Sequence, residues 1–405
     1  MKYLLGALFL VVSGAGFFLF WRADNVSEFA LFSASTTPAE VQPAGNPKNS
    51  EIKPGADIEP QKPLVNPPAE IKAVYATSWV AGTPSMFERL VNIAKTTEIN
   101  AIVIDVKDYS GYVAYDIKND AAERYKAKEI RIPKINSLIK RLHDGNIYVI
   151  ARISVFQDPR LAAARPDLAV KSKKNGKTWR DKKNLSWVDA ASEEAWEYNI
   201  AVAKDAAGRG FDEINFDYIR FPSDGNLNDA DFPFWNEKSP RRETLQKFFR
   251  RLNEELSGIP ISADLFGLTT TGADDLGIGQ VLEDAFGNFD YVAPMVYPSH
   301  FANGTFGFKN PAAHPYEVVK NSMESASKRL DAFYNATTTR AEINNSNSAV
   351  RFSKLRPWLQ DFDLGADYDA KMVKAQIEAS AEAKSAGWML WDPKNVYTKE
   401  ALISE

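Results

Sequence analysis

The 405-residue sequence predicts an α/β fold, a closed (β/α)8 or TIM barrel, in which eight strands alternate with helices. Three observations favour this fold class. Beyond residue 70, short runs of β-branched and aromatic residues alternate with amphipathic stretches. The strand runs are hydrophobic almost throughout, which is typical of parallel strands buried on both faces. Eight strand–helix units within residues 71–405 match a single barrel with long insertions.

The predicted strands begin at Ile71, Ile99, Ile147, Phe211, Ile259, Phe289, Val350 and Gly387. Helical patterns lie between them, over residues 84–98, 133–143, 192–209, 241–257, 280–286, 316–333 and 369–386. Several of these helices open on Pro or Ser and are followed by Gly, which are ordinary start and stop signals. A doubly wound open sheet is the alternative fold. Its phosphate-binding turn is rich in glycine, whereas the turn SWVAGTP after the first strand has one glycine.

The first 70 residues are predicted to lie outside the barrel. Tyr3 to Trp21 form an uncharged run that would be about 28 Å long as a helix, close to the thickness of a bilayer core. We interpret residues 1–22 as a signal anchor or a cleaved signal peptide. Residues 23–70 contain eight prolines and no apolar periodicity, so we expect a disordered linker. The barrel would then be membrane-anchored on the extracytoplasmic side, periplasmic or at the cell surface, or secreted after cleavage.

Composition narrows the chemistry that the barrel could perform. The absence of cysteine excludes thiolate metal sites and cysteine nucleophiles, and only three histidines are present, His143, His300 and His314. We therefore expect no metal and no cofactor. A formal charge of −4 disfavours a nucleic-acid partner, because such proteins usually carry a basic excess. Catalysis would then rest on carboxylates.

Aspartates stand at the ends of five predicted strands, at Asp105, Asp217, Asp264, Asp361 and Asp392. Because the interior of a barrel is apolar, such carboxylates belong at its mouth, where the carboxyl ends of the strands meet. Glycosidic bond cleavage needs two of them: one attacks or activates water, and a second of raised pKa protonates the leaving oxygen. A helix cap or a structural salt bridge is the alternative for each. Asp217 shares one strand face with Asn215, and Arg220 could pair with it.

Several segments resemble a known family. They are VYATSWVAG in the first strand, WVDAASEEAWEYNIAVAKDAAGRGFDEINFDYIRFPSDG at 187–225, ISADLFG and APMVYPSHF. These segments resemble a bacterial glycoside hydrolase family, a domain of unknown function in the TIM-barrel glycosidase superfamily, and more distantly the α-amylase and α-galactosidase groups. The resemblance covers residues 71 to about 395 and implies a catalytic Asp at the fourth strand, which is Asp217. The acid of the amylase-like enzymes is a Glu at the fifth strand, where this chain has Asp264. The acid of the α-galactosidase group is an Asp at the sixth strand, where it has Tyr297 and His300.

Aromatic residues gather in the loops at the carboxyl ends of the predicted strands. They are Trp79, Trp179, Trp187, Trp235, Tyr297, Trp358 and Trp391. Aromatic faces suit sugar rings, although for any single tryptophan a place in the core is the alternative. The predicted substrate-binding set is Asp105, Arg220, Trp79, Tyr297, His300, Asp361, Trp391 and Asp392. Residues 171–184, KSKKNGKTWRDKKN, form either a solvated hairpin that turns at Asn175 and Gly176 or a contact with an anionic glycan or membrane surface.

The sequence therefore predicts an extracytoplasmic glycoside hydrolase that acts on a cell-envelope polysaccharide, with Asp217 as nucleophile or base and Asp264 as the leading acid. The alternative is a non-catalytic barrel that binds envelope polysaccharide. An aldolase-type barrel with Lys107 as a Schiff-base lysine is disfavoured. That class usually handles phosphorylated substrates, and the loops after the last two strands have no glycine-rich phosphate cradle.

Overall fold

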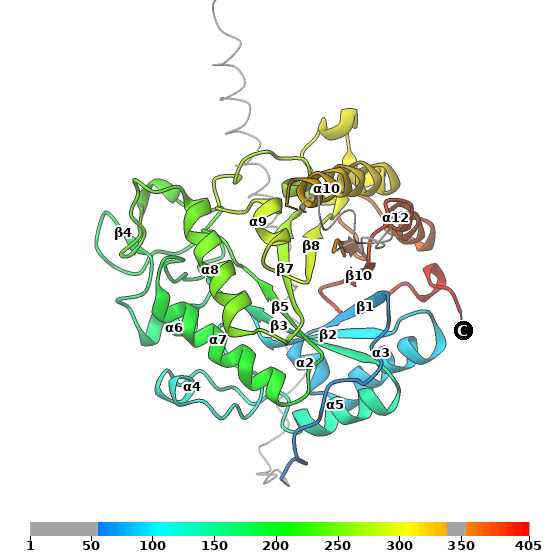
Figure 1. Ribbon diagram of the computed structural model, residues 1–405, viewed down its shortest axis with the longest axis horizontal. Coiled ribbons are helices and arrows are strands. Elements are labelled where there is room, and N and C mark those ends of the chain that lie inside the picture. Colours follow the sequence, from blue (N-terminus) through cyan, green and yellow to red (C-terminus); the bar gives the residue numbers. More distant parts are fainter. Residues whose placement is uncertain (1–55, 338–353, 405) are drawn as a thin grey trace, which may run out of the picture.

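The computed structural model describes residues 56–337 and 354–404, in which eight parallel strands close into a barrel (Figure 1). The strands are β1 (Ile71–Ala76), β2 (Ala101–Lys107), β3 (Tyr148–Ser154), β5 (Glu213–Asp217), β7 (Ile261–Phe266), β8 (Tyr291–Met295), β9 (Trp358–Gln360) and β10 (Gly387–Trp391). They neighbour one another in chain order, and β1 pairs with both β2 and β10. The closed ring confirms the predicted barrel and excludes the open sheet. A separate two-stranded ribbon joins β4 (Lys171–Ser172) to β6 (Ala230–Asp231).

The helices surround the strands (Figure 1). They are α2 (Ser78–Ala81), α3 (Pro84–Thr96), α4 (Asp120–Arg124), α5 (Ile135–Asp144), α6 (Pro159–Ala164), α7 (Glu193–Gly208), α8 (Arg241–Glu255), α9 (Leu282–Phe286), α10 (Pro315–Thr337) and α12 (Ala370–Glu382). Each of the seven predicted helices has a counterpart among them. The seventh strand differs, because β9 begins at Trp358 rather than at Val350, which lies outside the described residues. Leu355 forms an isolated bridge to Val292, and Pro357, which has no N–H to donate, follows it before β9 begins.

Two hydrophobic clusters divide the molecule into a barrel interior and a helical shell. The interior cluster contains alternate strand residues such as Ala73, Val103 and Ile150, and the outer cluster contains the residues between them, such as Val74. This alternation follows from the period of two in a strand. It sends the side chains of the last inward positions into the mouth of the barrel, where polar residues replace apolar ones.

Residues 57–64 contact α5 and the residue before β5, although the sequence assigns residues 23–70 to a disordered linker. Asp57 accepts hydrogen bonds from the backbone N–H of Asn136 (2.7 Å) and of Ser137 (3.1 Å) at the start of α5. The residue before that helix, Lys134, makes no side-chain cap of its own, so Asp57 supplies the missing acceptor. The Leu64 amide donates to Asp212 at 2.6 Å. The prediction of a linker that continues to residue 70 is therefore wrong for this last part.

The predicted membrane segment, residues 1–22, and the linker up to residue 55 lie outside the described residues. Within residues 56–337 and 354–404, no helix combines the length and the apolar character needed to cross a bilayer.

Candidate active site

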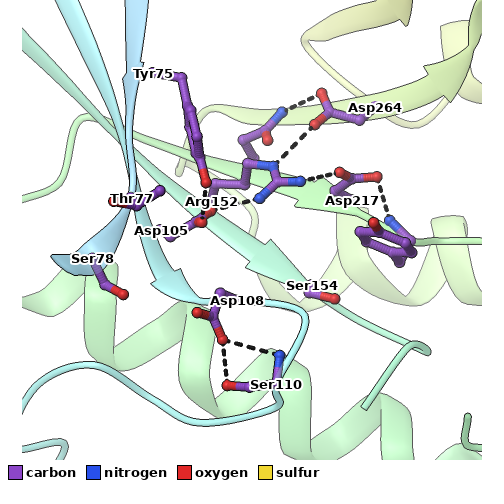
Figure 2. A network of polar contacts seen from close by, with 12 residues as sticks. Tyr75, Thr77, Ser78, Asp105, Asp108, Ser110, Arg152, Ser154, Asp217 and Asp264 are labelled. Atoms are coloured by element: carbon purple, nitrogen blue, oxygen red, sulfur yellow. Dashed lines mark hydrogen bonds and ion pairs between the residues drawn. The ribbon is translucent and has the colours of Figure 1, made fainter. Parts of the chain in front are cut away.

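Arg152 is the centre of a polar network at the carboxyl ends of the barrel strands (Figure 2). Its Nη1 donates to Asp105 Oδ1 at 2.6 Å, and its Nη2 donates to Asp217 Oδ2. Its Nε lies 3.6 Å from Asp264 Oδ2. These three aspartates come from β2, β5 and β7, and Arg152 comes from β3. One guanidinium therefore holds three of the five predicted strand-end carboxylates together in the barrel mouth.

Asp264 is the most deeply buried of the three, with 1% of its surface exposed. Its Oδ1 accepts hydrogen bonds from Asn215 Nδ2 and from Trp358 Nε1, both at 2.8 Å. Burial raises the pKa of Asp264 to about 7, the nearby charge of Asp217 adds to the rise, and Arg152 opposes it. Asp264 can therefore carry a proton near neutral pH, as a general acid must.

Asp217 is the last residue of β5 and accepts hydrogen bonds from two donors. One is Arg152 Nη2, and the other is the backbone N–H of Tyr218, at 2.5 Å. Tyr218 has φ of 53°, in the left-handed region that residues other than glycine seldom adopt. Such a conformation costs about 1–3 kcal/mol and often occurs at functional sites. Here the turn brings the Tyr218 amide to the Asp217 carboxylate, and both contacts suit an acceptor-only, ionised group.

Asp105 fixes the position of Arg152 together with Tyr75. The Tyr75 hydroxyl donates to Asp105 Oδ2 at 2.5 Å, and the Arg152 guanidinium lies 5.6 Å from the centre of the Tyr75 ring. Burial raises the pKa of Asp105, and the charge of Asp108 adds to this, although Arg152 opposes it. The pKa of Tyr75 is raised well above its usual value by burial and by Asp105. The contacts of Tyr75 and Asp105 therefore fix the orientation of the Arg152 guanidinium.

An aromatic wall flanks the carboxylates. Tyr297 stacks on Trp391 with ring centres 5.4 Å apart, and Phe362 packs edge-on against Trp391 at 5.1 Å. The ring of His300 lies 5.3 Å from that of Tyr297. The Trp391 ring centre lies 6.4 Å from that of Tyr75, whose hydroxyl binds Asp105, so the wall borders the carboxylates. Burial raises the pKa of Tyr297, and the charges of Asp264 and Asp217 add to the rise. Burial and the charge of Lys183 lower the pKa of His300 to about 4, which makes its imidazole neutral at pH 7.

Two of the five predicted strand-end aspartates are engaged elsewhere. Asp361 accepts hydrogen bonds from the backbone N–H (2.9 Å) and hydroxyl (2.7 Å) of Thr398. Asp392 accepts from the backbone N–H groups of Lys394 (2.6 Å) and Val396 (3.2 Å). Both carboxylates hold the segment after β10 in place, because they follow the last paired residues of β9 and β10 instead of ending an inward-facing row. Their contacts therefore match the alternative given for each strand-end aspartate, a structural capping role.

Arg220 does not form the expected pair with Asp217. Its Nη1 donates to the Phe221 carbonyl and to Ser223 Oγ, each at 3.1 Å. The left-handed conformation of Tyr218 ends the strand alternation, so the side chain of Arg220 no longer follows the inward face of β5. Arg152 takes the role that the sequence suggests for Arg220.

The predicted aromatic residues divide between the surface and the core. Trp79, on α2, is 59% exposed, and the Arg131 guanidinium lies 4.7 Å from its ring centre. Trp179, Trp187 and Trp358 are buried, as the core alternative has it. Trp235 is half-buried and packs edge-on against Phe221 at 5.2 Å. Trp79 is exposed, and Trp391 is half-buried in the aromatic wall beside the carboxylates, so these two tryptophans are the ones at the barrel mouth that are not fully buried.

Lys107 is fully buried and belongs to a structural ion pair. Its Nζ lies 2.8 Å from Asp158 Oδ2 and donates to the Ser154 carbonyl at 2.6 Å. A Schiff-base role would require an accessible amine, so the aldolase-type alternative does not fit this position.

Residues 171–178 form the predicted hairpin, with a bridge between Lys171 and Thr178 and φ of 68° at Gly176.

Sequence reasoning missed Arg152 and Tyr75, the two residues that assemble the network. A signal was present, because Arg152 is a lone cation within the otherwise apolar strand YVIARIS. An inward-facing arginine in a barrel strand needs carboxylate partners at the same level. Across the described ranges, no group of three or more histidine or acidic side chains has the arrangement of a metal site.

The closed barrel and its cluster of strand-end carboxylates define a TIM-barrel protein of the glycosidase type. The chain belongs to the family described as "putative glycosyl hydrolase domain", which matches residues 73–397. It is accordingly a glycoside hydrolase, an enzyme that hydrolyses glycosidic bonds of a carbohydrate substrate. None of the curated proteins matches the chain significantly.

Three solved structures are similar to this chain. A hypothetical protein from Ruminiclostridium thermocellum is 38% identical over 51% of this chain and 98% of its own, with a TM-score of 0.44. The glycoside hydrolase domain of PgaB (BpsB) from Bordetella bronchiseptica is 14% identical, covers 81% of this chain and 95% of its own, and gives a TM-score of 0.56. Alpha-L-fucosidase isoenzyme 2 from Paenibacillus thiaminolyticus is 12% identical, covers 82% of this chain and 48% of its own, and gives a TM-score of 0.50. The last two likenesses support the barrel fold.

Proposed function

We propose that this barrel cleaves a glycosidic bond in an extracytoplasmic or cell-envelope polysaccharide, with Asp217 and Asp264 as its carboxylate pair. One observation carries the proposal: both carboxylates contact the same guanidinium, yet burial and the charge of Asp217 raise the pKa of Asp264 to about 7. Two neighbouring carboxyl groups in different protonation states are what acid-assisted glycoside cleavage requires.

In the proposed reaction, the Asp264 carboxyl gives its proton to the leaving glycosidic oxygen. Asp217 either attacks the anomeric carbon or takes a proton from the attacking water, depending on the separation of the two groups once the sugar is bound. Arg152 stabilises the negative charge of Asp217 in the ground state. Asp105 and Tyr75 hold Arg152 in the orientation that reaches both carboxylates.

Aromatic rings would position the sugar. The stacked pair of Tyr297 and Trp391 lies beside the carboxylates, and Trp79 presents an exposed ring on α2. Ring faces of this kind cover the apolar faces of sugars. His300, which is neutral at pH 7, would add a polar contact without adding charge.

The proposal includes a location. The apolar run from Tyr3 to Trp21 and the proline-rich stretch after it support a barrel tethered outside the cytoplasmic membrane. Digestion of intact spheroplasts with an external protease tests this point. The tethered barrel should be cleaved without lysis, whereas protection until lysis would place it in the cytoplasm.

The catalytic pair is tested by comparing Asp217→Asn and Asp264→Asn for release of reducing ends from cell-envelope polysaccharides. Each variant should lose about 10²–10⁴-fold or more in kcat, the usual contribution of an acid or base. Asp264→Asn should regain activity on an aryl glycoside whose phenol needs no protonation, and Asp217→Asn should not. Asp144→Asn, an isosteric change in an exposed pair at the end of α5, is the matched control.

The non-catalytic alternative makes a different prediction for the same experiment. A binding barrel would retain polysaccharide in a pull-down assay, release no reducing ends in its wild-type form, and bind equally well in the Asp217→Asn variant. That combination would contradict the proposed function.

A further inference from the structure

A second buried cation lies beside the aspartates of the barrel mouth. Arg220 follows the end of β5 by three residues and is only 5% exposed. Its guanidinium lies 4.6 Å from the ring centre of Phe266 and 4.8 Å from that of Trp187. Phe266 ends β7, two residues beyond Asp264. Arg220 therefore lies at the same end of the barrel as the proposed catalytic pair.

The hydrogen bonds of Arg220 leave one edge of its guanidinium open. Nη1 is used by the Phe221 carbonyl and by Ser223 Oγ. Nε and Nη2 have no acceptor among the described residues, and no carboxylate oxygen in those ranges lies within 4.0 Å of the guanidinium. Neither Nε nor Nη2 is completely buried, so solvent can reach both atoms. Nε and Nη2 form the side-on edge that binds a carboxylate with two parallel hydrogen bonds.

The carboxylates near Arg220 are already engaged by other donors. Asp217 is bound by Arg152, Asp224 accepts from the Lys182 amide at 3.0 Å, and Asp181 accepts from Trp187 Nε1 at 2.9 Å. Burial lowers the pKa of Arg220 in spite of these three charges. A buried cation without a paired anion costs folding free energy, so its retention calls for a partner that is not part of the chain.

Lys183 brings a second cation to this side of the mouth. It is exposed and lies in the loop of residues 171–184, which packs on the loop after β5. The contact is tight, because a Cβ on Gly225 would come within 2.7 Å of the Trp179 ring. Burial lowers the pKa of His300, and the charge of Lys183 adds to this effect. The Lys183 amide donates to Asp181 Oδ1 at 2.9 Å, and Asp181 Oδ2 accepts from Nε1 of Trp187, whose ring centre lies 4.8 Å from the Arg220 guanidinium. Asp181 and Trp187 therefore connect the backbone of Lys183 to the Arg220 guanidinium.

We propose that Arg220 and Lys183 bind the carboxylate of an acidic sugar, so that the polysaccharide cut by this barrel contains uronic acid or similar residues next to the cleaved bond. The inference rests on the proposed function and names its substrate class. The open Nε and Nη2 edge of Arg220 would accept the sugar carboxylate, and Lys183 would close over it as a flexible point charge. In this proposal, the basic loop of residues 171–184 contributes Lys183 to the binding of an anionic sugar.

Binding of small sugars to the full-length protein separates this proposal from catalysis. D-Glucuronate should bind at least about tenfold more tightly than D-glucose in calorimetric titrations, because a charge-assisted bidentate contact is added. Arg220→Gln should abolish this preference, and Arg220→Lys should restore only part of it, since lysine has no planar fork. Lys183→Gln should reduce the preference by about two- to fivefold. Lys182→Gln, the exposed neighbour on the same loop, is the matched control and should leave it unchanged.

Equal binding of glucuronate and glucose by the wild-type protein would overturn the proposal, as would a preference that survives in both Arg220→Gln and Lys183→Gln. If Arg220→Gln fails to fold, the exposed Lys183→Gln decides together with a second substrate pair, an envelope polysaccharide before and after chemical reduction of its carboxyl groups. The native polymer should be cleaved at least about tenfold faster than the reduced one. Inorganic phosphate that competes with glucuronate at a lower concentration would assign the site to a phosphorylated glycan and reject the carboxylate.

The outcomes also separate this proposal from the proposed function. Hydrolysis that depends on Asp217 but shows no preference for acidic sugars would keep the glycosidase and reject the acidic substrate. A glucuronate preference that depends on Arg220, with no hydrolysis of any polysaccharide, would keep the anion site and reject the catalytic pair.

Discussion

Two arginine–carboxylate clusters lie inside the same barrel, and they differ in charge balance. At the amino-terminal end, Arg356 pairs with Glu213 through both of its Nη atoms, and neither side chain is exposed. At the carboxyl-terminal end, Arg152 serves Asp105, Asp217 and Asp264. Glu213 and Asp217 are the first and last residues of one strand, β5. The two clusters therefore share a scaffold and differ in the number of acids for each cation.

This difference in charge balance distinguishes a structural ion pair, the lower cluster of Arg356 and Glu213, from a proposed catalytic group, the upper cluster of Arg152 with its three aspartates. In the lower cluster, Ser262 Oγ donates to Glu213 at 2.5 Å, and the Tyr291 ring lies 4.2 Å from the Arg356 guanidinium. One anion faces one cation there. In the upper cluster, a single guanidinium cannot neutralise three buried carboxylates, so the pKa of Asp264 rises to about 7 because of its burial and of Asp217. In the proposed mechanism, this excess of acid is what keeps a proton on Asp264 for the leaving oxygen.

The largest effect on stability should come from breaking the balanced pair. Arg356→Met leaves Glu213 buried without a partner, which costs about 3–5 kcal/mol of unfolding free energy. Urea unfolding measures this loss. The double variant Arg356→Met with Glu213→Leu should recover most of the stability, since both charges are then absent. A single variant as stable as the wild type would remove the distinction drawn between the two clusters.

The unbalanced cluster should appear in the pH dependence of the reaction. The acid form of Asp264 falls about tenfold for each pH unit above its pKa near 7, so kcat/KM should decline with that slope on the alkaline side. Asp264 binds its proton more tightly in the folded protein than in the unfolded chain. Its contribution to stability is therefore complete below about pH 3.8 and is lost as the pH rises to about 7.

Asp264→Asn tests both parts of this prediction. The variant should lose the alkaline decline on aryl glycosides with good leaving groups, and its unfolding free energy should vary less with pH between about 4 and 7. An alkaline limb near pH 7 that persists in Asp264→Asn would assign the titration to another group.

A smaller effect is expected outside both clusters. Asp57 caps α5 from residues that precede the first strand, so Asp57→Ala should cost about 0.5–2 kcal/mol of unfolding free energy, with kcat unchanged. Thermal unfolding followed by circular dichroism measures the loss. An unchanged melting temperature would mean that residues 56–70 add nothing to the stability of the barrel.

The sequence predicted the part of the site that follows from strand periodicity. Asp105, Asp217 and Asp264 lie on inward-facing positions of β2, β5 and β7, so the rule that places strand-end carboxylates at the mouth was correct for them. The rule was wrong for Asp361 and Asp392, which lie beyond the paired residues of their strands. Asp361 accepts hydrogen bonds from Thr398, and Asp392 accepts from backbone N–H groups of the turn that follows it.

Other features depended on geometry that the sequence does not state. The pairing of Arg152 with three strands arises only when the barrel closes. The left-handed turn at Tyr218 moves Arg220 away from Asp217. The late start of β9 at Trp358 follows Pro357, which has no N–H to donate to a strand ladder.

The central claim, that the upper cluster is catalytic and the lower one structural, is tested most directly by Asp217→Asn. Activity and unfolding free energy should be measured on the same preparation. We predict a loss in kcat of at least about 10²-fold with unchanged or higher stability, because the change removes one charge from an over-acidic cluster. A variant that folds and keeps a tenth or more of the wild-type activity would contradict the claim.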